Sequence, residues 1–407
     1  MDSELLNFLA ATVIILVAAK LGGYASIRLG QPSVLGELLV GILLGPTVLN
    51  MLGAWPLLGG DEHLAASLTL FAEIGVILLM FLAGLELDLR DLLRSGRVAG
   101  LAGTLGVIVP LAGGFITARL FGIETVEAIF IGLALSATSV SISAQTLMEL
   151  GVLRSKVGLG LLGAAVFDDI LVVLLLSGAS VVFGANEGGA GIVVILLQMV
   201  LFLVGASAVG LYVVPWLMAR AERLPVSQAV PTAALVFCFV FAWASEALGG
   251  MAAITGAFMA GLFFARTSYK HHIETSLAAL AYALFVPIFL VNIGLQANLR
   301  AISGTAWFLA IALTVVAIVT KVIGSGLGAL AGGFDRRDSL RLGVGMISRG
   351  EVGLIVASVA LRADLIRPET FSGVVFMVIV ATLVTPPLLR LTYRDDAPTP
   401  VTRPRPE

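Results

Sequence analysis

Two adjacent carboxylates, Asp168 and Asp169, lie near the middle of an apolar stretch from 157 to 184. This stretch is long enough to cross a bilayer as a helix. A charged aspartate at the bilayer centre costs about 2.5–3.5 kcal/mol on insertion scales, so two in succession require a compensating charge, a proton or a bound cation. Such acids usually mark ion or proton pathways, and a structural ion pair is the alternative.

The composition indicates the class of protein. Of 407 residues, 59% are hydrophobic and only 12% are charged, whereas soluble domains contain about 25% charged residues. We therefore predict an all-α polytopic membrane protein within a lipid bilayer. The single cysteine, Cys238, excludes an intramolecular disulfide and a cysteine metal cluster. No phosphate-binding glycine loop, nucleophile elbow or nucleic-acid-binding patch occurs, so we expect no cofactor, no nucleic-acid partner and no enzymatic reaction.

Thirteen apolar segments are long enough to be membrane spans. Their approximate limits are 5–27, 33–50, 65–87, 98–120, 126–149, 157–184, 190–219, 227–246, 250–266, 278–298, 305–332, 339–361 and 369–393. Residues 1–394 are therefore predicted to form one transmembrane transporter domain. The short Pro-containing tail, 395–407, is expected to be disordered and cytoplasmic.

Basic residues are distributed unequally between the two sides of the membrane. Loops on the N-terminal side hold Arg119, Arg300, Arg362 and Arg367, whereas the opposite loops and the tail hold seventeen of the 24 Lys and Arg residues. We expect the protein to lie in the cell (plasma or inner) membrane. The positive-inside rule then places the N-terminus outside the cell and the C-terminus in the cytoplasm.

Three pairs of sequence blocks recur at offsets of 210 to 220 residues. The pairs are 83–92 with 293–302, 36–45 with 256–265, and 130–141 with 341–352. Partners seven spans apart have opposite orientations. We therefore predict an inverted-topology repeat, which in secondary transporters places the substrate site near the midplane.

Two segments of this repeat are interrupted in mid-membrane. Segment 126–149 is interrupted by Ser136, Thr138, Ser139, Ser141 and Ser143, and its partner by Gly345, Ser348, Arg349, Gly350 and Glu351. Discontinuous helices in corresponding positions indicate a transporter site, because unwound backbone can coordinate ions. Close helix packing is the alternative for the serine run. We expect the two breaks to cross near Asp169.

Lys321 lies in the middle of segment 305–332, too far from either end to reach water easily. A buried ammonium requires a carboxylate partner or loses its proton. Arg349 and Glu351 are two residues apart and are expected to form a structural ion pair, joined by Glu73. This leaves the aspartate pair for Lys321, with a bridge to another acid as the alternative.

Protons and a small cation are expected to compete for one site. Na⁺ takes oxygen ligands, which the two aspartates and the hydroxyls and carbonyls of segment 126–149 can provide. When the cation binds, Lys321 loses its anionic partner and gives up its proton more readily. Exchange, rather than symport, is the expected result.

Four motifs occur in order along the chain: ALSATSVSISAQTLMELG, AAVFDDILVVLLLS, TKVIGSGLGALAGG and GMISRGEVGLI. Over residues 1 to 394 they resemble the monovalent cation:proton antiporter superfamily, specifically its NapA/NhaA-like electrogenic sodium/proton antiporters. The membrane domain is also similar to Kef-type potassium-efflux transporters.

The resemblance implies an NhaA-like fold with two discontinuous crossed helices, and a homodimer. It implies a dimerisation domain at 1–50 and 190–266, and a moving core domain at 65–184 and 278–393.

The resemblance also implies roles for individual residues. Asp169 corresponds to the main cation and proton carboxylate, Asp168 to the partner of Lys321, and Na⁺ is expected at both aspartates. Thr138 and Ser139 fall on the first crossover, and Arg349 and Glu351 fall on the second. Asp rather than Asn at position 168 indicates electrogenic exchange.

The sequence therefore predicts a secondary active antiporter that exchanges Na⁺ or Li⁺ for H⁺ by alternating access. One alternative is a K⁺/H⁺ antiporter, and another is an ion channel or sensor without coupled exchange. Lys321 beside two acids favours exchange, because a passive pore does not need a group that changes protonation in each cycle.

Overall fold

A computed structural model describes residues 3–54, 62–87, 89–183, 192–296, 300, 304 and 306–394. The elements of this part are helical: α1 (Ser3–Arg28), α2 (Ser33–Leu44), α3 (Met51–Ala54), α4 (Glu62–Glu86), α5 (Leu89–Arg94), α6 (Gly96–Leu120), α7 (Thr125–Ser136), α8 (Val140–Glu149), α9 (Lys156–Val182), α10 (Ile192–Ala221), α11 (Ala229–Ala247), α12 (Ala253–Phe264), α13 (Lys270–Leu280), the π-helical turn η1 (Ala281–Phe285), α14 (Val286–Leu295), α15 (Ala306–Gly332), α16 (Arg336–Gly345), α17 (Glu351–Arg362) and α18 (Pro368–Thr392). The expected disordered tail lies outside the described residues.

Membrane-spanning helices account for most of the described chain. Ten candidate spans are long and apolar enough to cross a bilayer, and three shorter apolar helices occur at Ser33–Leu44, Ala253–Phe264 and Val352–Leu361. Apolar side chains remain exposed along these helices, especially on α1 and α10. Such an outward apolar surface is favourable in lipid, where each helix satisfies its own backbone hydrogen bonds.

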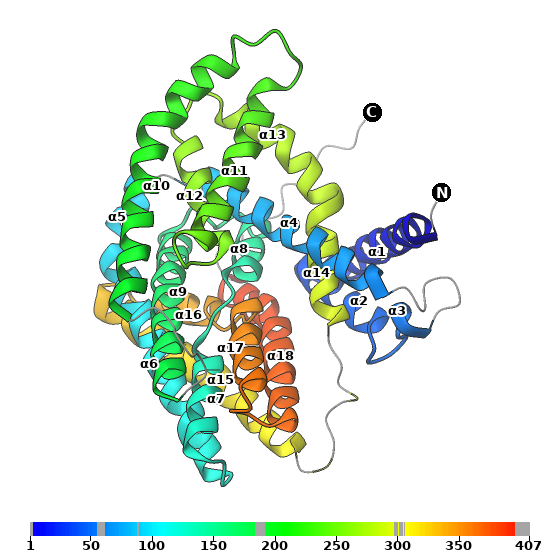
Figure 1. Ribbon diagram of the computed structural model, residues 1–407, viewed down its shortest axis with the longest axis vertical. Helices are drawn as coiled ribbons and strands as arrows, with labels where there is room; N and C mark the ends of the chain where they lie inside the picture. Colours follow the sequence, from blue (N-terminus) through cyan, green and yellow to red (C-terminus); the bar gives the residue numbers. More distant parts are fainter. Residues whose placement is uncertain are drawn as a thin grey trace.

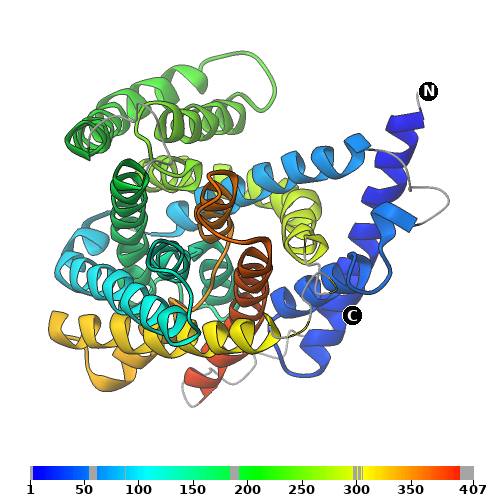
Figure 2. The same cartoon turned by 60° about the horizontal axis from the view of Figure 1, so that its bottom comes forward.

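The helices pack in two groups (Figure 1, Figure 2). The first group contains α1, α2, α4 and α10 to α14, and the second contains α6, α7, α9 and α15 to α18; α8 contacts both. The sequence-based division placed 65–87 and 278–298 in the core domain. In the structure α4 packs against α12 and α14, and α14 packs against α2. Both segments therefore pack with the first helix group, which contains α2 and α12, rather than with the second.

Glycines allow two helix pairs of the first group to approach closely. A Cβ atom on Gly41 of α2 would lie 2.9 Å from the Cα of Gly294 in α14. In the same way, a Cβ on Gly84 of α4 would lie 3.1 Å from the Cα of Gly261 in α12. Gly294 follows Gly84 by 210 residues and Gly261 follows Gly41 by 220. By these offsets α2 corresponds to α12, and α4 corresponds to α14. The α2–α14 contact is therefore the counterpart of the α12–α4 contact.

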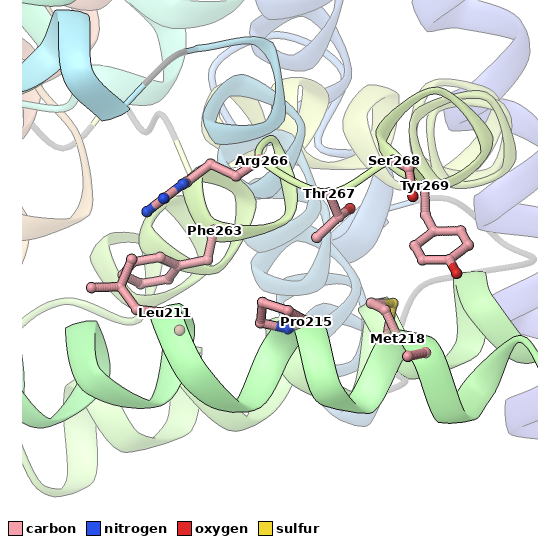
Figure 3. Close-up of a pocket in the computed structure, with 10 residues that line it drawn as sticks. Leu211, Pro215, Met218, Phe263, Arg266, Thr267, Ser268 and Tyr269 are labelled. Atoms are coloured by element: carbon pink, nitrogen blue, oxygen red, sulfur yellow. The ribbon is translucent and has the colours of Figure 1, made fainter.

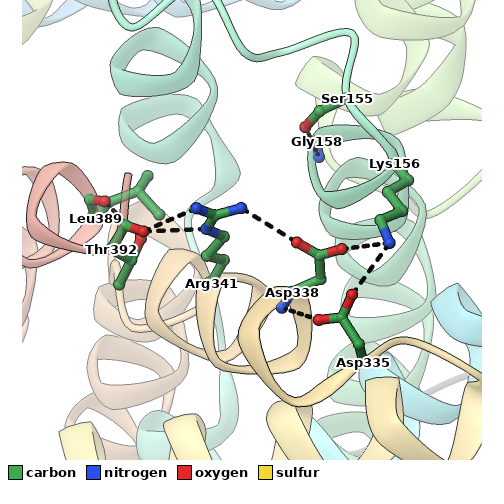
Figure 4. Close-up of polar contacts among 8 residues, drawn as sticks. All are labelled: Ser155, Lys156, Gly158, Asp335, Asp338, Arg341, Leu389 and Thr392. Atoms are coloured by element: carbon green, nitrogen blue, oxygen red, sulfur yellow. Dashed lines mark hydrogen bonds and ion pairs between the residues drawn. The ribbon is translucent and has the colours of Figure 1, made fainter. Parts of the chain in front are cut away.

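An ionic network joins three helices of the second group at one end (Figure 4). The Lys156 ammonium of α9 lies 2.5 Å from the Asp338 carboxylate and 3.4 Å from Asp335. Arg341 of α16 pairs with Asp338 at 3.2 Å and donates to the Thr392 carbonyl of α18 at 3.0 Å. These contacts fix α16 relative to α9 and α18.

Alanine at Gly41 tests the close approach of α2 and α14. The new methyl group must push the helices apart, so Gly41→Ala should lower the stability by about 1–3 kcal/mol. Gly205 of α10 has open space around its Cα, so Gly205→Ala should leave the stability unchanged or slightly higher. The two variants can be compared by their Tm in detergent. Equal Tm values would contradict the described packing.

Asp335 provides a pH-dependent test of the network. Its side chain accepts the Asp338 N–H at 2.8 Å as the N-cap of α16, and this hydrogen bond lowers the pKa of Asp335 below its ordinary value. The stabilisation is then present above the unfolded-state pKa, about 3.9, and is lost as the pH falls through the lower folded-state pKa.

We expect Asp335→Ala to lower Tm at neutral pH and to lose this effect in strong acid. Glu124 occupies the N-cap position of α7 but forms no side-chain cap hydrogen bond. Glu124→Ala is therefore a matched control that should leave Tm unchanged throughout. A Tm deficit of Asp335→Ala that persists below the folded-state pKa would contradict the role of the charged carboxylate.

Candidate ion-binding site

The two aspartates lie on a continuous helix, α9, but face different neighbours. Ser155 caps α9 by accepting the Gly158 N–H at 3.3 Å. Asp168 is fully buried and Asp169 is 8% exposed. Successive helical residues are about 100° apart around the axis. Asp168 therefore turns toward α15, whereas Asp169 turns toward α12 of the other group.

Lys321 of α15 is fully buried, and its ammonium has three acceptors. It lies 2.7 Å from Asp168 Oδ1, 2.7 Å from the Gly106 carbonyl and 2.8 Å from the Ser136 carbonyl. An ammonium has three donors, so each is satisfied. A buried ion pair persists when its charges and remaining donors are compensated in this way. The structure therefore contains the expected Lys321–Asp168 pair.

Two helices are broken beside this pair. One helical segment stops at Ser136 and resumes at Val140, and the other stops at Gly345 and resumes at Glu351. The breaks touch, because the Ser139 N–H donates to the Ser348 carbonyl at 3.0 Å and the Ser143 hydroxyl donates to the Gly345 carbonyl at 2.5 Å. The unwound backbone is thus partly paired across the junction.

Arg349 is fully buried at this junction. Its Nη1 donates to the Ala137 carbonyl at 2.6 Å and its Nη2 to the Ala317 carbonyl at 3.4 Å. The last carbonyls of a helix lack intrahelical donors and carry partial negative charge, so a guanidinium at the end of α7 is favourable.

The expected ion pair of Arg349 with Glu73 does not form. Glu73 is exposed on α4, whereas the described partners of the Arg349 side chain are carbonyls. The end of α7 and the middle of α15 supply these acceptors, which spacing along the sequence does not reveal. The side chain of Glu351 lies outside the described residues.

Asp169 lies at the seam between the two helix groups. Its Oδ2 accepts a hydrogen bond from the Thr255 hydroxyl of α12 at 3.3 Å. The remaining gap beside the carboxylate has a volume of about 10 Å³ and is lined in part by Met80, Ile254 and Phe258. Thr255 is not among the site residues that the sequence predicts, because one threonine in an apolar segment carries no recognisable signal.

Several buried oxygen atoms near the breaks have no hydrogen-bond partner among the described residues. They are Thr138 Oγ1, Ser348 Oγ and Asp168 Oδ2. Ser139 Oγ lies 3.4 Å from Ser141 Oγ. Oxygen atoms on unwound backbone and carboxylates are ligands that suit a monovalent cation in transporters. No group of three His, Cys, Asp or Glu side chains that could hold a metal occurs in the described part of the chain.

A separate cavity lies between α10 and the turn from α12 to α13 (Figure 3). Its volume is about 360 Å³, and its lining includes Pro215, Met218, Phe263, Arg266 and Tyr269. Neither α9 nor α15 contributes a residue to this lining. The cavity is therefore distinct from the site at the aspartates.

A family model described as "Sodium/hydrogen exchanger, transmembrane" matches residues 13–391. The chain belongs to the sodium/hydrogen exchanger family. This family consists of membrane transporters, so the exchanger is not an enzyme.

Relatives with high identity extend over nearly the whole exchanger. The chain is 44% identical over 388 residues to the Na(+)/H(+)-K(+) antiporter GerN of Bacillus cereus, covering 95% of this chain and 96% of that protein. It is 38% identical over 386 residues to a Na(+)/H(+) antiporter of Enterococcus hirae, covering 95% and 98%. The fold resembles the sodium proton antiporter MjNhaP1 of Methanocaldococcus jannaschii, with a TM-score of 0.73, 16% identity, and coverage of 98% and 99%.

Removal of the Lys321 charge should destabilise the exchanger. Lys321→Gln leaves a buried carboxylate without its cation, and breaking such a pair costs about 3–5 kcal/mol. The double variant Lys321→Gln with Asp168→Asn removes both charges and should recover most of the lost stability. Thermal unfolding of the two variants in detergent measures this coupling. A Tm of Lys321→Gln equal to that of the wild type would contradict the pairing.

Proposed function

We propose that the exchanger is a secondary active antiporter that moves Na⁺ or Li⁺ against H⁺ by alternating access. The arrangement of Asp169 carries this proposal. Its carboxylate lies at the seam between two helix groups, one residue from an acid that is already neutralised by Lys321. A single carboxylate at a seam can take either a cation or a proton, which couples the two fluxes.

Two breaks beside the aspartates support a cation site. Thr138 and Ser139 provide oxygens at the first break, and Ser348 provides its hydroxyl at the second. We assign Na⁺ to Asp169 and Asp168 with ligands from this junction, as in transporters with discontinuous helices. Arg349 remains with its carbonyls as a structural cation.

The charges at the junction favour electrogenic exchange. Asp168, Asp169, Lys321 and Arg349 together carry no net charge when all four are ionised. A cation at Asp169 displaces one proton from that carboxylate. When the cation also engages Asp168, Lys321 loses its anionic partner and releases a second proton. Two protons then move against one cation, which transfers net charge across the membrane.

Potassium is a second candidate substrate. The printed name of the relative GerN includes K(+) as well as Na(+). Carboxylates and carbonyls also coordinate K⁺. Transport of each cation must therefore be measured separately.

The mirrored glycine contacts support an inverted repeat in the exchanger. Gly41 with Gly294 and Gly261 with Gly84 relate α2–α14 to α12–α4, as expected when the repeats have opposite orientations. We further propose that the exchanger crosses the cell membrane thirteen times, with the N-terminus outside the cell and the C-terminus in the cytoplasm. In the homodimer, we assign dimerisation to the first helix group and movement to the second.

The exchanger in liposomes with an internal pH dye tests the proposed function. Na⁺ or Li⁺ should trigger a proton flux that depends on the membrane potential. Asp169→Asn should reduce this flux at least a hundredfold, because the amide cannot exchange a proton for a cation. Glu124→Ala, purified and reconstituted in the same way, is the control and should transport at the wild-type rate.

The possible results separate the substrates and the site. A flux triggered by K⁺ alone would move the substrate assignment to K⁺. No flux with any cation in the wild type would reject antiport. Persistent exchange in a folded Asp169→Asn variant would remove Asp169 from its central role.

A further inference from the structure

The hydrogen bond between Thr255 and Asp169 connects the two helix groups. Thr255 is 4% exposed and belongs to α12 of the first group, whereas Asp169 is 8% exposed and belongs to α9 of the second. The bond joins Thr255 Oγ1 to Asp169 Oδ2 at 3.3 Å. If the groups move relative to each other, this contact must break in each cycle.

The surroundings of Thr255 also favour a charged carboxylate. Thr255 is the third residue of α12, and the N-cap residue, Ala252, forms no side-chain cap hydrogen bond. The first turn of a helix carries partial positive charge, which stabilises an anion beside it. Asp169 therefore faces both a hydroxyl donor and the beginning of α12 across the seam.

The seam around this contact has little free space. The gap of about 10 Å³ beside Asp169 is lined mainly by apolar side chains, including Met80 of α4 and Phe258 of α12. About 10–15 Å³ is needed to hold even one water molecule. A hydrated cation therefore does not fit while Thr255 and Asp169 are in contact.

We propose that Thr255 is a positioning residue that holds the unloaded Asp169 carboxylate against α12 and competes with the cation for Oδ2. This inference rests on the proposed exchange at Asp169. The hydroxyl donates a hydrogen bond and occupies one of the lone pairs with which Oδ2 can bind a cation. The closed seam is then stable only without a cation, which limits leakage of cations through it.

Thr255→Val tests the competition, because valine has a similar shape but lacks the hydroxyl donor. We expect the KM for Na⁺ to fall about three- to tenfold, the effect of losing one hydrogen bond of ordinary net strength. The maximal rate should change less than the KM. Thr255→Ser retains the donor and should restore the wild-type KM.

A matched control distinguishes this effect from general loss of a buried hydroxyl. Thr314 is 6% exposed, and its hydroxyl donates to the Ala310 carbonyl within its own helix at 2.7 Å. Thr314→Val should leave the KM for Na⁺ unchanged. The rise of Tm with Na⁺ concentration gives a second measure of affinity, since a ligand stabilises the folded state that binds it. In Thr255→Val, the Na⁺ concentration that gives half of the rise in Tm should fall by the same factor as the KM.

The outcomes are distinct. An unchanged KM in Thr255→Val, with normal exchange in the wild type, would overturn this inference and leave the proposed function intact. A raised KM would also overturn it, because Thr255 would then be a cation ligand. If Thr255→Val does not fold, Thr255→Ala also lacks the donor and should show the same fall in KM. A wild type without cation-driven exchange would reject the proposed function itself.

Discussion

The bond between the Lys321 ammonium and the Asp168 carboxylate is the interaction on which the rest of the site depends. Both groups are fully buried, and both lie on candidate membrane-spanning helices. Neither charge is stable there alone. The two backbone carbonyls that Lys321 also binds come from α6 and from the end of α7. One ammonium therefore fixes the relative positions of α9, α15, α6 and the first break.

The first break is possible because the cationic side chains of Lys321 and Arg349 replace the missing backbone donors. A helix that stops inside a membrane leaves carbonyls that water cannot reach. At the end of α7, the Ser136 carbonyl accepts from both Lys321 and Arg349, and the Ala137 carbonyl accepts from Arg349. The buried guanidinium thus has a structural function at the first break. The hydroxyl oxygens of Thr138 and Ser348, which have no hydrogen-bond partner among the described residues, remain at the two breaks.

Helical geometry gives the two aspartates different tasks. Because adjacent residues point about 100° apart, one carboxylate is held inside the second helix group and the other reaches the seam with the first. Asp168 contributes to the stability of the junction through its ion pair with Lys321. Asp169 lies where a movement between the two groups would change its contacts. The same geometry brings Thr255 to Asp169. In the proposed exchange, Asp168 is the fixed charge and Asp169 is the exchangeable one.

The sequence by itself determined the class of protein, the apolar segments, both helix breaks and the need of Lys321 for an acid. These features follow from hydropathy and from the cost of burying charge, which act on each segment separately. Only the tertiary structure decided that Arg349 binds carbonyls rather than Glu73, that α4 and α14 pack with α2 and α12, and that Thr255 contacts Asp169. Such contacts join residues far apart in the chain, and they depend on helix rotation and packing, which composition and spacing leave open.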